Sequence, residues 1–150
     1  MLDRVDNWPQ ELEAYIRSIQ DKPFKWGEHD CVLGALGCAE AILKADFTSN
    51  IRGKYTTALG AAKRMKVLFG AVELPNAADA FRSHTGSEPI QATFAQRGDI
   101  VEAEVQLPDG GLAPALGFIG LDNRYGLFVG PAGLTKIPIS QCSRAWRVGL

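Results

Sequence analysis

A change in hydrophobic periodicity near residue 89 constrains the fold of this chain more than any other feature of its sequence. Before that point apolar residues recur at helical spacing, and after it short apolar runs are separated by glycine and proline. Helices followed by antiparallel strands are typical of the α+β class, which we therefore predict. The 150 residues contain no internal repeat and no low-complexity linker, so we expect a single domain over residues 1–150.

Four helices are expected in the first part of the chain. The first runs from about Pro9 to Gln20, and Asn7 with Gln10 before its apolar residues has the spacing of a capping box. The third begins at Thr56 or Thr57 and ends at Gly70, and a short fourth runs from Asn76 through Phe81 and Arg82.

The second helix is the most apolar. Asp30 is a suitable N-cap for it, and it runs to about Lys44. Two glycines within it, Gly34 and Gly37, lower helix propensity and predict that another backbone packs very close. Small and apolar residues recur at helical spacing along one face, which predicts that this helix is buried. They are Cys31, Ala35, Cys38, Ala39 and Ile42.

The second part of the chain is expected to form short strands. Residues tolerant of positive φ, in Asp109-Gly110-Gly111 and Asp122-Asn123, predict turns between them. The predicted strands are 99–105, 116–121, 125–129, 134–139 and 145–148.

Composition excludes several classes of function. With 16 basic and 17 acidic residues there is no overall field to hold a polyphosphate, so nucleic acid is not an expected partner. The longest apolar run, Cys31 to Leu43, is shorter than the roughly 20 residues that span a bilayer, and no signal peptide precedes it. Three cysteines without paired spacing suit a reducing cytoplasm and predict no metal site or other cofactor.

The segment from Pro23 to Cys31 carries the clearest chemical signal. It places the Cys31 thiol in the first turn of a helix, after a loop that contains Trp26, Gly27 and His29. Free N–H groups at a helix N-terminus lower the pKa of a thiol and favour the nucleophilic thiolate. Asp30 opposes this effect because its negative charge disfavours a second one beside it. Cys31 is therefore either a nucleophile or an inert packed thiol.

Within this segment Phe24-Lys25-Trp26-Gly27 precedes Asp30-Cys31, and two further motifs accompany it. They are Arg97-Gly98-Asp99-Ile100-Val101 and the ending Cys142-Ser143-Arg144-Ala145-Trp146-Arg147-Val148. Together with the apolar Ala-Leu-Gly run at 115–117, they resemble the NlpC/P60 cysteine peptidases, and most closely the NlpC/P60-like proteins of phage and prophage tail modules. The resemblance covers most of residues 20 to 148. It implies a papain-like fold with N-terminal helices on a small C-terminal antiparallel sheet or half-barrel.

The resemblance also implies which positions would carry catalysis. Active members of the family cleave peptidoglycan stem peptides with a cysteine, a histidine at the start of a strand and a third polar residue on the next strand. By position, Cys31 is the nucleophile, the histidine falls at Ala115, and the third residue falls near Leu127 or Phe128. Because the base is missing, the chain looks like a degenerate member of the family.

Either of two histidines could be considered as a substitute base. His29 lies two residues before Cys31, where only a loop that folds back would bring the imidazole to the sulfur. His84 lies in the polar segment Ser83-His84-Thr85-Gly86 and is expected to be solvated. We expect Cys38 and Cys142 to be buried, and Trp26 and Trp146 to pack in the core. Trp8 is either a hydrophobic staple or an exposed anchor for a partner.

Between residues 44 and 66 the chain carries six basic residues against one acid, Asp46. Such a stretch is usually a solvated surface, and it would also serve to dock an acidic partner. The residues are Lys44, Arg52, Lys54, Lys63, Arg64 and Lys66.

Three functions remain open at this stage. The first is a tail-tip or baseplate protein of the virion, made in the host bacterial cytoplasm, that binds tail hub and distal tail proteins without catalysis. The second is an active cysteine peptidase or amidase acting on peptidoglycan during phage entry, with Cys31 and His29 as its catalytic pair. The third is an assembly factor that leaves the finished particle. Fold alone does not choose among them.

Overall fold

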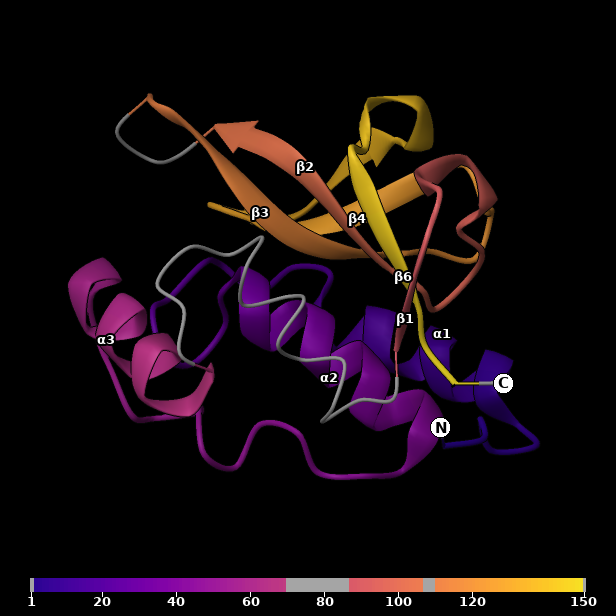
Figure 1. The fold of residues 1–150 in the computed structure, drawn as a ribbon, viewed down its shortest axis with the longest axis horizontal. Coiled ribbons are helices and arrows are strands. Elements are labelled where there is room, and N and C mark those ends of the chain that lie inside the picture. The colour runs from indigo at the N-terminus through magenta and orange to yellow at the C-terminus, as the bar shows by residue number, and fades with distance from the viewer. Residues whose placement is uncertain (1, 70–86, 107–109, 150) are drawn as a thin grey trace.

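The computed structural model of the chain describes residues 2–69, 87–106 and 110–149. Within these ranges three α-helices form one layer and a six-stranded antiparallel sheet forms the other (Figure 1). The predicted α+β class is therefore confirmed. The N-terminal and C-terminal ends of the chain lie near each other at one end of the two layers (Figure 1).

The helices are α1 (Trp8–Ile19), α2 (Cys31–Leu43) and α3 (Ala58–Phe69). The first two agree with the predicted bounds to within a residue. The side chain of Thr57 accepts a hydrogen bond from the backbone N–H of Gly60 at 3.0 Å, so this threonine begins α3 as one of the two predicted positions. The expected helix over 76–82 lies outside the described residues, as does the predicted end of the third helix at Gly70.

The two predicted N-caps differ. A side-chain oxygen of Asp30 accepts a hydrogen bond from Leu33 N at 3.0 Å, which confirms it as the cap of α2. The capping box at Asn7 is wrong, because the Asn7 side chain makes no cap bond and instead donates to Glu11 Oε1 at 3.2 Å.

The strands follow one another in an antiparallel sheet with the order β1-β6-β2-β3-β4-β5. The central pair, β2 with β3, is the longest and runs in register from Ile100 opposite Phe118 to Gln106 opposite Leu112. The strands are β1 (Glu88–Ile90), β2 (Ile100–Gln106), β3 (Leu112–Ile119), β4 (Tyr125–Gly130), β5 (Gly133–Pro138) and β6 (Arg144–Arg147).

Two strands depart from the sequence prediction. The predicted strand over 116–121 in fact begins at Leu112 and ends at Ile119, because its first half pairs with β2 although it contains Pro114, a residue disfavoured within a strand. Strand β1 was not predicted. It is a three-residue edge strand with Pro89 at its centre, a position where proline removes no hydrogen bond of an inner ladder. The turn at Asp122-Asn123 is confirmed by Asn123, whose φ is +61°.

Helix α2 is buried, as predicted, and packs between α1 and strands β3 and β4. The reason for its glycines differs from the prediction, since side chains rather than a backbone lie against them. A Cβ atom at Gly37 would meet the hydroxyl of Tyr15, and one at Gly34 would meet Val129 Cγ2 at 2.7 Å. Tyr15 uses the space to donate a hydrogen bond to the Gly34 carbonyl at 2.7 Å.

Two apolar clusters form the core. The first lies between the helices and the sheet and includes Leu116, Phe118 and Trp146. The second contains alternate residues of the same strands, among them Ala115 and Val101, as expected for opposite directions of successive side chains. It is closed by the short 3₁₀ helices η1 (Ala92–Phe94) and η2 (Ile139–Gln141). Cys31, at the N-terminal end of α2, packs against both clusters.

Candidate functional site

The loop before α2 is held in one conformation by its own backbone. Lys25 and His29 form an isolated antiparallel bridge, with Lys25 N donating to His29 O at 2.9 Å and His29 N donating to Lys25 O at 2.8 Å. Gly27 at the tip has a φ of +79° and lies directly against the Tyr55 carbonyl group, where a Cβ atom would overlap it. The glycine of the Trp-Gly motif is therefore required by both backbone conformation and space.

Asp30 organises this loop and the start of α2 together. Its carboxylate is buried and accepts hydrogen bonds from Leu33 N at 3.0 Å, Gly27 N at 3.1 Å and the Tyr55 hydroxyl at 2.6 Å. Burial, followed by the negative charge of Asp30, raises the pKa of Tyr55 above its usual range. Tyr55 is a partner that sequence reasoning missed, because it lies 25 residues away on a loop without a recognisable motif.

Cys31 is partly buried immediately after this cap. Desolvation of the thiol raises its pKa to about 12, and the negative charge of Asp30 acts in the same direction. Hydrogen bonds from the backbone N–H groups of Leu116 on β3 and Val32 on α2 act in the opposite direction but are weaker. The helix N-terminus thus does not produce the reactive thiolate that its position suggests.

The side chains around the thiol are apolar at the positions where the resemblance places catalytic partners. Ala115 is 4% exposed and Phe128 is 1% exposed, and both belong to the second cluster, against which Cys31 packs. Leu127 belongs to the first cluster, against which Cys31 also packs. These positions belong to the clusters against which Cys31 packs, and none of them supplies a group that exchanges a proton.

His29 is buried, with 7% of its surface exposed, and its Nε2 atom has no hydrogen-bond partner among the described residues. Its pKa is lowered, first by burial and then by the positive charge of Lys22, with Arg52 acting in the same direction and Asp30 against them. No hydrogen bond joins the imidazole to Cys31 within the described part of the chain. The other candidate, His84, lies outside the described residues.

The remaining cysteines and tryptophans have the expected surroundings. Cys38 and Cys142 are buried thiols, and Trp146 is 1% exposed in the first cluster. Trp26 is partly buried against the same cluster and contacts Phe24 edge-on. Trp8 is the first residue of α1, so it does not occupy the position of a hydrophobic staple, and it also packs against the core.

None of the three pockets lined by described residues includes Cys31 or His29 in its wall. In the same part of the chain, no three His, Cys, Asp or Glu side chains gather as they would to hold a metal ion. No helix among the described residues is both long and apolar enough to cross a membrane.

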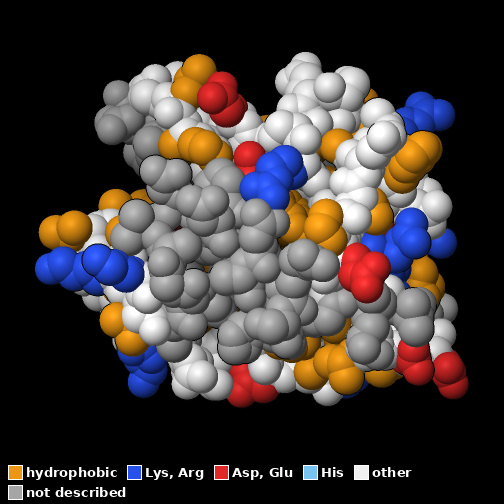
Figure 2. Space-filling model, in the orientation of Figure 1, with side chains coloured by type: hydrophobic (Ala, Val, Ile, Leu, Met, Phe, Trp, Pro, Cys, Tyr) orange, Lys and Arg blue, Asp and Glu red, His pale blue; other side chains and the backbone are white. Residues whose placement is uncertain are grey.

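The basic stretch between residues 44 and 66 is partly used within the protein. Lys44 forms an ion pair with Glu11 at 2.7 Å, and Arg52 and Arg64 donate to backbone carbonyl groups. Figure 2 shows basic side chains beside hydrophobic ones at the edge of the molecule where α3 lies. The members that are exposed without an ion pair among the described residues are Lys54, Lys63 and Lys66.

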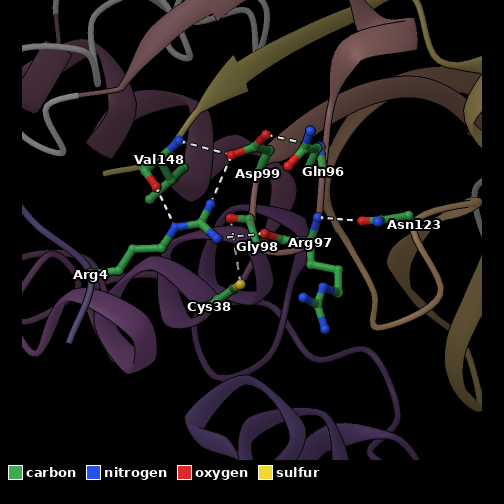
Figure 3. A network of polar contacts seen from close by, with 8 residues as sticks. All are labelled: Arg4, Cys38, Gln96, Arg97, Gly98, Asp99, Asn123 and Val148. Carbon is green, nitrogen blue, oxygen red and sulfur yellow. Dashed lines mark hydrogen bonds and ion pairs between the residues drawn. The ribbon is translucent and has the colours of Figure 1, made fainter. Parts of the chain in front are cut away.

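A second polar arrangement lies at the other end of α2 (Figure 3). Arg4 donates from Nη2 to Asp99 Oδ1 at 2.9 Å, from Nη1 to the Arg97 carbonyl at 2.7 Å, and from Nε to the Val148 carbonyl at 2.8 Å. Asp99 also accepts from the backbone N–H groups of Val148 and Gln96. The Arg-Gly-Asp motif therefore ties the N-terminal segment to the last strand, and Arg4 is the member that sequence reasoning missed.

Comparison with known proteins gives a family but no characterised relative. No curated protein and no solved structure matches the chain significantly. One family model, described as a domain of unknown function (DUF6950), matches residues 3–148. That span includes both the loop before Cys31 and the network around Asp99, so both arrangements lie within one family domain, and the chain belongs to the DUF6950 family.

Proposed function

We propose that this chain is a tail-tip or baseplate structural protein of a phage or phage-like particle, with a degenerate NlpC/P60-like fold, and that it acts by binding tail hub and distal tail proteins. The observation that carries the proposal is the apolar surrounding of Cys31, at the positions where the resemblance expects a base and its orienting residue. The protein would be made in the host bacterial cytoplasm and stay in the virion.

The chemistry of the thiol supports a role without catalysis. Because burial raises the pKa of the Cys31 thiol to about 12, the thiol is protonated at pH 7. A cysteine peptidase needs the thiolate as nucleophile and a general acid to protonate the leaving amine. Ala115 and Phe128 provide neither function, and the Nε2 atom of His29 makes no hydrogen bond to the thiol in the described structure.

The arrangement of the elements supports the resemblance itself. A cysteine begins a buried helix, that helix packs on β3 and β4, and the closing Ala-Trp-Arg segment forms β6 beside β2. A domain that retains the fold but has alanine at the position of the base is expected to act by binding partners through its surface rather than by catalysis.

The first experiment measures the rate of Cys31 alkylation by iodoacetamide from pH 6 to pH 10, with mass spectrometry to separate it from Cys38 and Cys142. We expect a slow reaction whose rate is still rising at the highest pH, and no reaction at this position in Cys31→Ser. A rate that reaches its plateau below pH 8 would show a poised thiolate and would contradict the proposal.

A second experiment separates the structural role from peptidoglycan cleavage. The wild-type chain and Cys31→Ala are incubated with purified peptidoglycan, and released peptides are measured by mass spectrometry. We expect neither protein to release stem peptides. Cleavage by the wild type but not by the variant would establish the cysteine peptidase instead.

The third experiment tests the location. In purified particles from cells that express the chain, we expect it to sediment with the tail and to cross-link to hub proteins, and Cys31→Ala to do the same. A chain found only in the unassembled fraction would act as an assembly factor, and the structural proposal would then be wrong.

A further inference from the structure

A pocket of about 420 Å³ opens beside the Arg4–Asp99 network, at the opposite end of α2 from Cys31. Its wall includes three arginines, Arg4, Arg97 and Arg147, together with the carboxylate of Asp99 and the indole of Trp8. Pockets that hold small ligands are of this size, whereas a single inorganic ion occupies much less space.

The charges that line this pocket do not cancel. Asp99 is 2% exposed, and its carboxylate is already bound by Arg4 and by two backbone N–H groups. All three nitrogens of the Arg4 guanidinium also donate to partners within the network. Asp99 therefore neutralises the charge of Arg4, and the pocket keeps the positive charges of Arg97 and Arg147.

Neither remaining arginine has an ion pair among the described residues. The Arg97 backbone belongs to the network, but its side chain turns away from it (Figure 3) and lies over the Trp8 ring at 5.2 Å. Arg147 is exposed on β6, opposite Glu88 in register but without an ion pair to it. Burial lowers the pKa of Arg4, and the positive charges of Arg97 and Arg147 act in the same direction, against the charge of Asp99.

The other walls of the pocket restrict the kind of anion. The Trp8 ring lies against two guanidinium groups, that of Arg4 at 4.4 Å and that of Arg97 at 5.2 Å, and so holds the Arg97 side chain at the pocket. Asn123 accepts a hydrogen bond from Arg97 N through Oδ1, which leaves its NH₂ group as a further donor. Guanidinium groups bind carboxylates through paired, planar hydrogen bonds. Nucleic acid is a poor candidate because it needs basic residues along a continuous surface, and this charge is confined to one pocket.

We propose that this pocket binds a carboxylate carried by a partner protein, either an acidic side chain or a chain terminus, between the Arg97 and Arg147 guanidinium groups and against Trp8. The identity of the partner as a protein rests on the proposed function. The preference for a carboxylate rests on the pocket alone.

The test is an NMR titration of the ¹⁵N-labelled full chain with acetyl-Leu-Glu, which carries two carboxylates, followed at the indole N–H of Trp8. We expect a saturable shift with a dissociation constant below about 1 mM. The uncharged analogue acetyl-Leu-Gln-amide should bind at least about tenfold more weakly, because it lacks the charge-assisted hydrogen bonds.

Variants assign the binding to the pocket. Arg97→Gln and Arg147→Gln should each weaken binding about tenfold, since each removes a charged donor while leaving the backbone network in place. Arg17→Gln removes the same charge from an exposed position on α1, where Arg17 is paired with Glu13, and should leave binding unchanged within about twofold. Urea unfolding of each variant checks that the fold is retained.

Three results would overturn the proposal: equal affinity for the charged and uncharged peptides, an equal loss in Arg17→Gln, or equally tight binding of inorganic phosphate through the same arginines. The last would identify a site for free oxyanions. None of these measurements depends on Cys31 or on the particle, so their failure is distinguishable from failure of the proposed function. If both proposals hold, Arg97→Gln with Arg147→Gln should also reduce cross-linking to hub proteins.

Discussion

The two ends of helix α2 use polar groups in opposite ways. At the N-terminal end Cys31 packs against the apolar cluster that contains Ala115 and Phe128, and the Nε2 atom of His29 is buried without a partner among the described residues. Towards the C-terminal end, Val5 N donates to the Ile42 carbonyl and Cys38 approaches the Gly98 carbonyl, so the helix adjoins the fully bonded Arg4–Asp99 network. At one end of α2 a buried ion pair joins the two ends of the chain, whereas at the other the buried Asp30 carboxylate serves as the helix cap and the positions expected to carry a base are apolar.

The largest expected effect is at the charged end. Asp99→Ala should lower the free energy of unfolding by about 3–5 kcal/mol, because it leaves Arg4 as a partly buried cation without its carboxylate and strips an acceptor from Val148 N and Gln96 N. Urea unfolding of the variant and wild type measures the difference. A loss below about 1 kcal/mol would mean that water replaces the carboxylate, and the contrast between the two ends would then be wrong.

A smaller effect is expected from the cap at the thiol end. Asp30→Ala should cost about 2–3 kcal/mol, since it removes the helix cap and a charged partner of the Tyr55 hydroxyl. Asn7→Ala is the matched control, because Asn7 stands at the same position of α1 without a side-chain cap bond and should change stability by less than about 0.5 kcal/mol. Equal losses in the two variants would show that the Asp30 bonds contribute little.

The thiol itself should matter less still. Cys31→Ala removes one partly buried sulfur atom, so we expect it to cost about 1 kcal/mol in urea unfolding. The same variant should bind acetyl-Leu-Glu as the wild type does, because the pocket lies at the other end of α2. A change in that affinity would show that the two ends of α2 are energetically coupled and do not act independently.

The smallest effect is a pH dependence from His29. Its pKa is lowered from the ordinary value of 6.5 by burial, by Lys22 and by Arg52, against the opposing charge of Asp30. The unfolded chain therefore binds the proton more readily than the folded one, and this contribution to stability is present above pH 6.5 and lost as pH falls below it. Thermal unfolding from pH 7.5 to pH 5 should show a steeper decline for the wild type than for His29→Gln. Parallel declines would mean that the buried imidazole is already protonated or exposed.

Local patterns were sufficient to place the three helices among the described residues and most of the strands. The cap at Asp30, the buried face of α2 and the turn at Asn123 depend on residues within a few positions of one another, and the structure confirms them. Strand β1 could not be found in this way, because a short edge strand with a central proline has no alternation to detect. The glycines of α2 correctly indicated close packing, but sequence spacing does not show whether a backbone or a side chain fills the space.

The candidate sites likewise contain some features that local sequence predicts and others that depend on residues far apart in the chain. The position of Cys31 at a helix start was readable from the loop motif, whereas the high pKa of its thiol depends on how the clusters around it pack. Tyr55 and Arg4 escaped detection because each bonds a residue far away in the chain. Arg97 and Arg147 come from separate motifs, and only the antiparallel sheet brings them to one pocket with Trp8.

The bond from Arg4 to the Val148 carbonyl joins residues 144 positions apart. During translation Arg4 is therefore made long before its carbonyl partner. Helices α1 and α2 can pair as soon as they emerge, because their contacts are local, whereas the network around Asp99 must wait for β6. The arginine pocket is therefore assembled only after the last strand has joined the sheet, so an incomplete chain cannot present it to a partner.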